Sequence, residues 1–99
     1  MRQHNPPHPG EIIREIYLEP LKGKVSNTEI AKHLNVSRSA FNRLITGKSD
    51  LTTDMAFRLS RVLGSSPESW VNLQSAYDVW QTSKSFDTSK VKPLNMNIS

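Results

Sequence analysis

Polar side chains with helical spacing lie between Arg38 and Thr46. This segment carries two arginines, an asparagine and two hydroxyl residues. On a helix that turns by about 100° per residue they share one face. Guanidinium groups can bind guanine, an amide can bind adenine, and hydroxyls can bind base edges or phosphates. The spacing therefore predicts a helix that contacts base pairs in the major groove. The predicted base-contacting residues are Arg38, Ser39, Asn42, Arg43 and Thr46.

The opposite face of this predicted helix is apolar. Ala40, Phe41 and Leu44 fall within one arc of the helical wheel, so we expect them to pack on the rest of the protein. Ser37 has the side chain of an N-cap, and Gly47 suits the C-terminal cap. The helix is therefore predicted to begin after Ser37 and to end near Thr46.

A second short helix is predicted just before the first. Ser26 and Glu29 have the spacing of a capping box at its start. Ala31 is small enough to allow close approach where the two helices cross. Asn35 lies in the connection and tolerates the left-handed conformation that a sharp turn requires. Residues 27–47 together indicate a helix-turn-helix.

Positive charge is concentrated around this motif. Residues 22–48 carry six basic side chains and one acidic one. Residues 1–21 carry two basic and three acidic side chains, and residues 49–99 carry five of each. Such a local excess indicates a polyanionic partner, although a solvated charged face remains an alternative. Lys48, Thr52 and Thr53 follow the base-contacting helix and could bind a phosphate.

Two alternatives without DNA remain for these residues. Arg38 and Arg43 could form surface ion pairs with Asp50 or Asp54. Thr52 could act only as the N-cap of the next helix, and capping is compatible with phosphate binding.

Three further helices complete an all-α prediction. The first begins at Pro9, buries a face that includes Ile12, Ile13, Ile16 and Tyr17, and is ended by Pro20. The others are capped by Thr52 and by Ser66, with Pro67 at the first helical position. We expect a flexible N-terminus over 1–8, a helical domain over 9–83 and a C-terminal tail over 84–99.

Aromatic and apolar side chains recur at intervals of three and four along the last helix. They belong either to the core or to a subunit interface. We predict a homodimer contact, because one short helix reads few base pairs and a two-fold dimer reads a palindrome with half-sites about 34–36 Å apart. The predicted dimer residues are Trp70, Leu73, Tyr77 and Trp80.

The sequence gives no positive signal for catalysis, a cofactor or a metal. It has no cysteine and only four glycines, and no acid pair is placed in an apolar segment. His4 and His8 flank two prolines without a third ligand at suitable spacing, so we expect an exposed loop there. Because no apolar run approaches membrane-spanning length, we expect a soluble cytoplasmic protein with no membrane partner.

Three segments resemble a known family. "HPGEIIREIYLEPL", "TEIAKHLNVSRSAFNRLITGK" and "LTTDMAFRLSRVLGSSPESWVNLQSAYD" are similar to the HigA antitoxins of the XRE-type helix-turn-helix group, which includes VapI-like proteins. The resemblance covers about residues 8–80, and "GSSPESWVNLQSAYD" is its most distinctive part. It implies a compact five-helix lambda-repressor-like domain.

The resemblance also implies a type II toxin–antitoxin role. Such a protein represses its own operon as a dimer on double-stranded operator DNA and binds a RelE-like, HigB-type mRNA-cleaving toxin. Asn27 falls where a phosphate-contacting residue is frequent in the wider family, and we add Thr28 and Ser37 to the predicted phosphate contacts. The alternatives are a repressor without a toxin, or a toxin-binding protein with only residual DNA binding.

Overall fold

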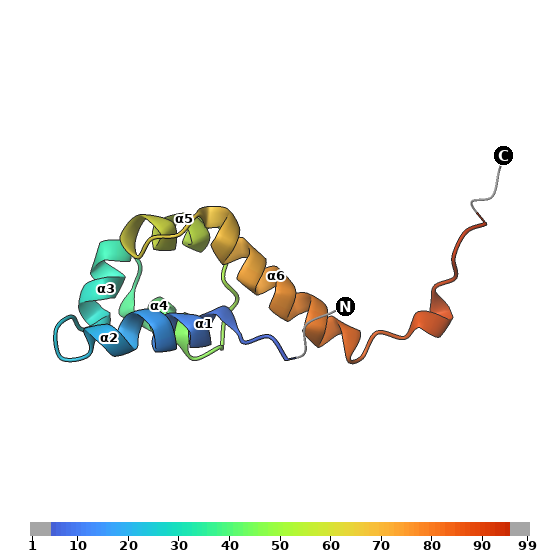
Figure 1. The fold of residues 1–99 in the computed structure, drawn as a ribbon, viewed down its shortest axis with the longest axis horizontal. Coiled ribbons are helices and arrows are strands. Elements are labelled where there is room, and N and C mark those ends of the chain that lie inside the picture. Colours follow the sequence, from blue (N-terminus) through green and yellow to red (C-terminus); the bar gives the residue numbers. More distant parts are fainter. Residues whose placement is uncertain (1–4, 96–99) are drawn as a thin grey trace.

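The computed structural model describes residues 5–95, which contain helices and no strand. The first helix consists of three directly consecutive segments: α1 (Pro9–Ile12), the π-helix η1 (Ile13–Leu18) and α2 (Glu19–Leu21). Four α-helices follow: α3 (Asn27–Leu34), α4 (Arg38–Ile45), α5 (Thr53–Val62) and α6 (Pro67–Ser83). Figure 1 shows α3, α4 and α5 gathered at one end, with α6 leading away from them. The predicted all-α, five-helix fold is confirmed.

Four predicted N-caps are confirmed. Ser26, Ser37, Thr52 and Ser66 each accept a hydrogen bond from the backbone N–H three residues further on. These bonds satisfy donors that the first turn of a helix leaves unpaired. The helix boundaries are therefore set by local side-chain chemistry.

The prediction that Pro20 ends the first helix is wrong. The helix continues to Leu21, and Glu19 keeps helical backbone angles. The Glu19 N–H bonds to the carbonyl of Arg14, five residues earlier, in the wider π-helical pattern. A proline in a regular helix clashes with the carbonyl four residues before it, and the wider turn relieves that clash.

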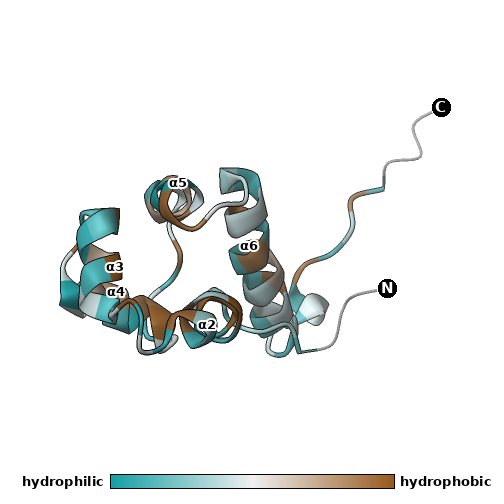
Figure 2. Cartoon of the chain, turned by 60° about the vertical axis from the view of Figure 1, so that its left-hand side comes forward, coloured by the Kyte–Doolittle hydropathy of each residue, from teal (hydrophilic) through white to brown (hydrophobic). Residues whose placement is uncertain are grey.

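The core lies between the first helix, α3, α4, α5 and the start of α6. Figure 2 shows both hydrophobic and hydrophilic positions on α3 and α6. Ile16 does not belong to the core, because it is 57% exposed although the sequence predicted it on the buried face. The buried hydrophobic residues are Ile13, Ile30, Ala31, Leu34, Phe41, Leu44, Ile45, Leu51, Ala56, Leu59 and Trp70.

The predicted exposed loop at His8 is also wrong. His8 is buried, and its Nδ1 accepts a hydrogen bond from the Gly10 N–H at 2.9 Å, which caps α1. Its ring meets Tyr77 of α6 edge-on with centroids 5.0 Å apart. The residues just before α1 therefore pack against α6. His4 lies outside the described residues.

The turn between α3 and α4 has a left-handed residue, as the sequence predicts. Asn35 has φ 58° and ψ 45°; its N–H bonds to the Lys32 carbonyl, and the next N–H, of Val36, bonds to the Ala31 carbonyl. This is the pair of bonds of a Schellman motif, which closes the end of a helix.

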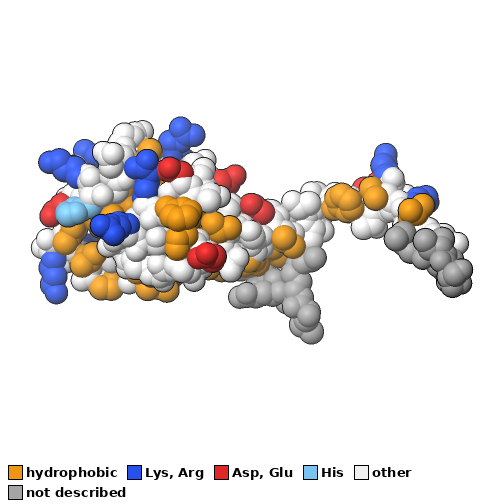
Figure 3. All heavy atoms as spheres, turned by 90° about the horizontal axis from the view of Figure 1, so that it is seen from above, with side chains coloured by type: hydrophobic (Ala, Val, Ile, Leu, Met, Phe, Trp, Pro, Cys, Tyr) orange, Lys and Arg blue, Asp and Glu red, His pale blue; other side chains and the backbone are white. Residues whose placement is uncertain are grey.

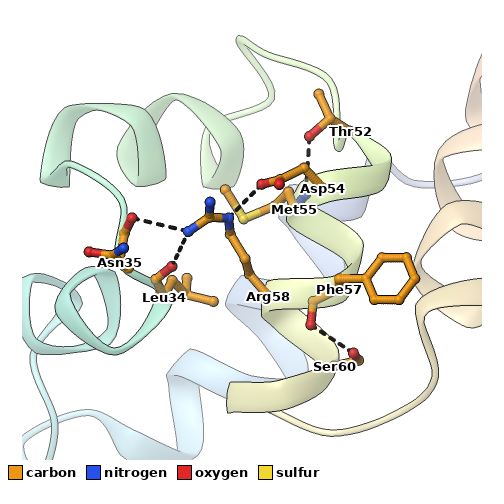
Figure 4. A network of polar contacts seen from close by, with 8 residues as sticks. All are labelled: Leu34, Asn35, Thr52, Asp54, Met55, Phe57, Arg58 and Ser60. Atoms are coloured by element: carbon orange, nitrogen blue, oxygen red, sulfur yellow. Dashed lines mark hydrogen bonds and ion pairs between the residues drawn. The ribbon is translucent and has the colours of Figure 1, made fainter.

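Arg58 of α5 completes this turn (Figure 4). Its Nη1 donates to the carbonyls of Leu34 at 2.9 Å and Asn35 at 3.2 Å, and its Nε pairs with Asp54. The carbonyls left over at the end of α3 thus bind a cation, which the helix dipole also favours.

The chain after α6 projects away from the helices (Figures 1 and 3). This tail contains one short 3-10 helix, η2 (Thr88–Lys90). Hydrogen bonds from the Ser89 hydroxyl and then from its backbone N–H lower the pKa of Asp87 at the start of η2. The projecting tail explains a radius of gyration of 17.3 Å, against about 13 Å for a compact chain of this length.

No helix within residues 5–95 has the length and apolar character needed to cross a membrane.

Candidate nucleic-acid interface

The five predicted base-contacting residues lie together, four on α4 and the fifth, Thr46, at its C-cap. They line one open surface depression of about 510 Å³, and Lys48 completes its wall. Asn42 is half-buried and the others are exposed. The depression therefore presents two guanidinium groups, an ammonium group, an amide and the Ser39 hydroxyl to an approaching ligand. The Thr46 hydroxyl donates to the Asn42 carbonyl at 2.7 Å, so only its acceptor lone pairs face a ligand. The residues that line the depression are Arg38, Ser39, Asn42, Arg43, Thr46 and Lys48.

The buried face of α4 differs in part from the helical-wheel prediction. Phe41 and Leu44 are buried as expected, and Ile45 joins them at 5% exposure. Ala40 is exposed, so its predicted place in the core is wrong. It lies at the border of the two faces, where a small side chain is accepted by either environment.

The ion-pair alternative for the two arginines is wrong within the described part of the chain. The one ion pair found there joins Asp54 to Arg58. Asp50 instead accepts a hydrogen bond from the Gln74 amide at 3.3 Å. The guanidinium groups of Arg38 and Arg43 therefore have no carboxylate partner in residues 5–95.

The end of α4 places Lys48 beside the arginines. Gly47 has φ 77°, a conformation in which glycine avoids the strain that other residues incur. The Lys48 N–H bonds to the Arg43 carbonyl at 2.8 Å, and the Gly47 N–H bonds to the Leu44 carbonyl at 3.1 Å. This second Schellman motif turns the chain back toward the depression.

The loop after Lys48 is held by a buried side chain of α6. The Gln74 side-chain oxygen accepts from the Leu51 N–H at 2.7 Å, and its amide donates to Asp78 at 2.9 Å. Leu51 is itself buried. Gln74 thereby fixes the loop that leads to Thr52 and Thr53.

Besides Lys48 in the loop after α4, the predicted phosphate contacts lie at three helix starts. Asn27 and Thr28 are the first residues of α3, and Asn27 lines a 370 Å³ depression with Arg14 and Lys22. The hydroxyls of Ser37 and Thr52 cap α4 and α5, while their side chains remain exposed. Thr53 is the exposed first residue of α5.

Three residues important for this surface were missed by the sequence reasoning. Arg14 donates from Nη1 to the Ile45 carbonyl at the end of α4, and Arg58 and Gln74 hold the flanking turns. All three act on residues more than 20 positions away in the chain. Local spacing contains no signal for such contacts.

Trp70 does not belong to a subunit interface. It is 2% exposed within its own chain, and its indole N–H donates to the Gly64 carbonyl at 2.9 Å. The ring centroids of Trp70 and Tyr17 are 5.4 Å apart. Because Trp70 is already covered, its prediction as a dimer residue is corrected to core. Leu73, Tyr77 and Trp80 are half-buried and stay predicted dimer residues.

Residues 5–95 contain no group of three or more side chains that could hold a metal ion.

A polar, basic face on a short helix, anchored by a preceding helix and a tight turn, defines a helix-turn-helix protein. The family model described as Helix-turn-helix matches residues 15–70. The chain therefore belongs to the helix-turn-helix family, and its relatives include the HigA antitoxins that the sequence resembles.

Similar proteins cover nearly the whole chain. The HTH-type transcriptional regulator YddM of Escherichia coli K12 is 43% identical over 95% of this chain and 97% of its own. Antitoxin HigA-1 of Vibrio cholerae is 33% identical over 90% of this chain and 84% of its own. Among solved structures, PA4674 of Pseudomonas aeruginosa in complex with its operator DNA has a TM-score of 0.80 and 32% identity, over 90% of this chain and 97% of that one.

Proposed function

We propose that this protein is a dimeric operator-binding repressor that also neutralises a RelE-like, HigB-type mRNA-cleaving toxin. The observation that carries the DNA-binding part is the depression formed by four α4 side chains, the C-cap residue Thr46 and Lys48. Arginine and asparagine side chains can discriminate guanine and adenine there. The similarity to PA4674, which was solved with operator DNA, and to antitoxin HigA-1 supports the two roles. The proposed setting is the cytoplasm.

A two-fold dimer suits this kind of surface. α4 has eight residues and can contact only a few base pairs. Two copies related by symmetry bind two half-sites about 34–36 Å apart, which raises both affinity and specificity. Leu73, Tyr77 and Trp80 of α6 are the proposed dimer contacts.

Replacing Arg38 by alanine tests base contact. We expect a loss of about 1–3 kcal/mol in operator binding, with relaxed preference at one base position. Arg38→Lys is the matched control, because it keeps the positive charge and loses the paired donors that bind guanine. It therefore separates the effect of charge from the effect of base contact. Binding to the operator and to scrambled DNA is measured by fluorescence anisotropy. Operator affinity equal to that of the unchanged protein would show that Arg38 makes no base contact.

Lys48→Ala tests phosphate contact. Because a phosphate contact carries no base identity, affinity should fall equally for operator and scrambled DNA. The slope of log K against log salt should become shallower by about one. Lys90→Ala, in the projecting tail, is the control and should leave the slope unchanged. A sequence-dependent loss for Lys48→Ala contradicts the phosphate assignment.

The toxin part is tested with the reading frame adjacent to this gene. Its purified product should bind this protein in solution, and co-expression of the two should relieve growth arrest. Without such binding, the protein is a repressor alone. Toxin binding combined with equal, weak affinity for operator and scrambled DNA would instead favour an antitoxin with residual DNA binding.

A further inference from the structure

The outer surface of the first helix combines carboxylates with exposed isoleucine. Glu11, Glu15 and Glu19 are all exposed and follow one another at intervals of four residues. Ile16 is 57% exposed, and Ile12 is half-buried beside it. We call these five residues the acidic helix face. A large apolar side chain exposed among charges is typical of an interaction surface.

An apolar groove lies next to this face. It has a volume of about 210 Å³ and is lined by Ile12, Ile16 and Tyr17 from the first helix, and by residues of α6 and of the turn before it. Ile16 belongs to the π-helical segment η1, a type of distortion that is frequent at functional sites. The groove offers space for an apolar side chain of a partner. Leu73, a proposed dimer contact, lines its α6 side, so the oligomeric state has to be measured on any variant of the groove.

Charge decides which partner fits. Three carboxylates repel the phosphates of DNA. In a two-fold dimer, the same surface meets itself, so a second copy would place carboxylates against carboxylates. A protein with lysine or arginine side chains around an apolar residue is complementary to both the face and the groove.

We propose that the acidic helix face and its groove bind the toxin, through a basic toxin surface whose apolar side chain enters beside Ile16. This proposal rests on the proposed antitoxin function. A protein that cleaves mRNA must bind a polyanion, so we expect a basic surface on it.

The acidic helix face is separate from the base-contacting depression. The two share no residue. Gly10 of the first helix packs against the backbone of Leu44 and Ile45, on the buried side of α4. Glu19, at the end of the acidic helix face, lines the depression that contains Asn27, whereas Glu15 and Ile16 line neither that depression nor the base-contacting one. A toxin bound beside Ile16 therefore leaves the base-contacting residues of α4 free.

The test measures binding of the purified product of the adjacent reading frame by calorimetry, using the full chain. Ile16→Arg places a positive charge at the centre of the proposed contact and should weaken binding at least about tenfold. The double variant Glu15→Lys and Glu19→Lys should weaken it as well and reduce its dependence on salt. Phe57→Arg is the matched control, because Phe57 is 61% exposed on α5.

Operator binding and oligomeric state are measured on the same variants. For Ile16→Arg both should match the unchanged protein, which shows that this variant folds and dimerises. The double lysine variant should keep the oligomeric state, but its DNA affinity should rise because it adds positive charge beside Asn27. If the unchanged protein binds the toxin and Ile16→Arg binds it equally well, the proposed surface is wrong while the antitoxin function stands. If Ile16→Arg instead produces monomers, the face is a contact between copies of this chain. Failure of the unchanged protein to bind the toxin overturns the antitoxin function and this surface together.

Discussion

Gly10→Ala is expected to destabilise the protein strongly. A Cβ at position 10 would lie 2.1 Å from the Leu44 carbonyl oxygen and 2.9 Å from the Ile45 Cα. These obstacles are backbone atoms of α4, so no side chain can move aside, and the helices must separate. Forcing an extra group into such a contact costs about 1–3 kcal/mol, and here we expect the upper end. The melting temperature should fall by roughly 10–20 °C.

Gly10→Ala should also weaken operator binding, because α4 carries the base-contacting residues. Thermal unfolding followed by circular dichroism and anisotropy with operator DNA measure the two effects. Ala76→Ser, on the exposed surface of α6, adds one atom without a backbone obstacle and serves as control. An unchanged melting temperature for Gly10→Ala would show that the first helix does not pack this closely on α4.

Arg58→Met is the second substitution with a large expected effect. It keeps the apolar stem of the side chain and removes the charged donors to the Leu34 and Asn35 carbonyls. Hydrogen bonds from charged groups contribute about 1.5–3 kcal/mol. Because the side chain is 35% exposed, we expect the lower part of that range in the free energy of unfolding.

Arg58→Met should also lower the affinity for operator DNA, because Arg58 holds the turn that sets the position of α4 relative to α3. Chemical denaturation and operator affinity are measured together. Arg61→Met removes the same charge three residues further along α5, where the side chain is exposed. If the two substitutions lower operator affinity equally, the effect comes from net charge, and the turn does not depend on Arg58.

Much of the fold follows from local rules. Ser26, Ser37, Thr52 and Ser66 cap the predicted helices because a hydroxyl can reach the free N–H three residues on. Asn35 adopts its left-handed turn for an equally local reason. Pro20 is the exception: a proline normally ends a helix, but a π-helical turn makes room for it.

The candidate site was predicted through helical periodicity. A spacing of three and four residues places Arg38, Asn42 and Thr46 on one face whatever surrounds the helix. The same rule failed for Ala40 and Ile16, at the border between buried and exposed faces. There, burial depends on how far the neighbouring element extends, and a helical wheel contains no such information.

The amino-acid sequence by itself determined where the helices begin, which side chains share the outer face of α4, and where positive charge gathers. These properties depend on neighbours within about one helical turn. Only the tertiary structure decided that Trp70 is core, that Gly10 must be glycine, and that Arg14, Arg58 and Gln74 anchor the recognition surface. Each of these depends on contacts between residues far apart in the chain, and those distances are set by the packing of whole helices.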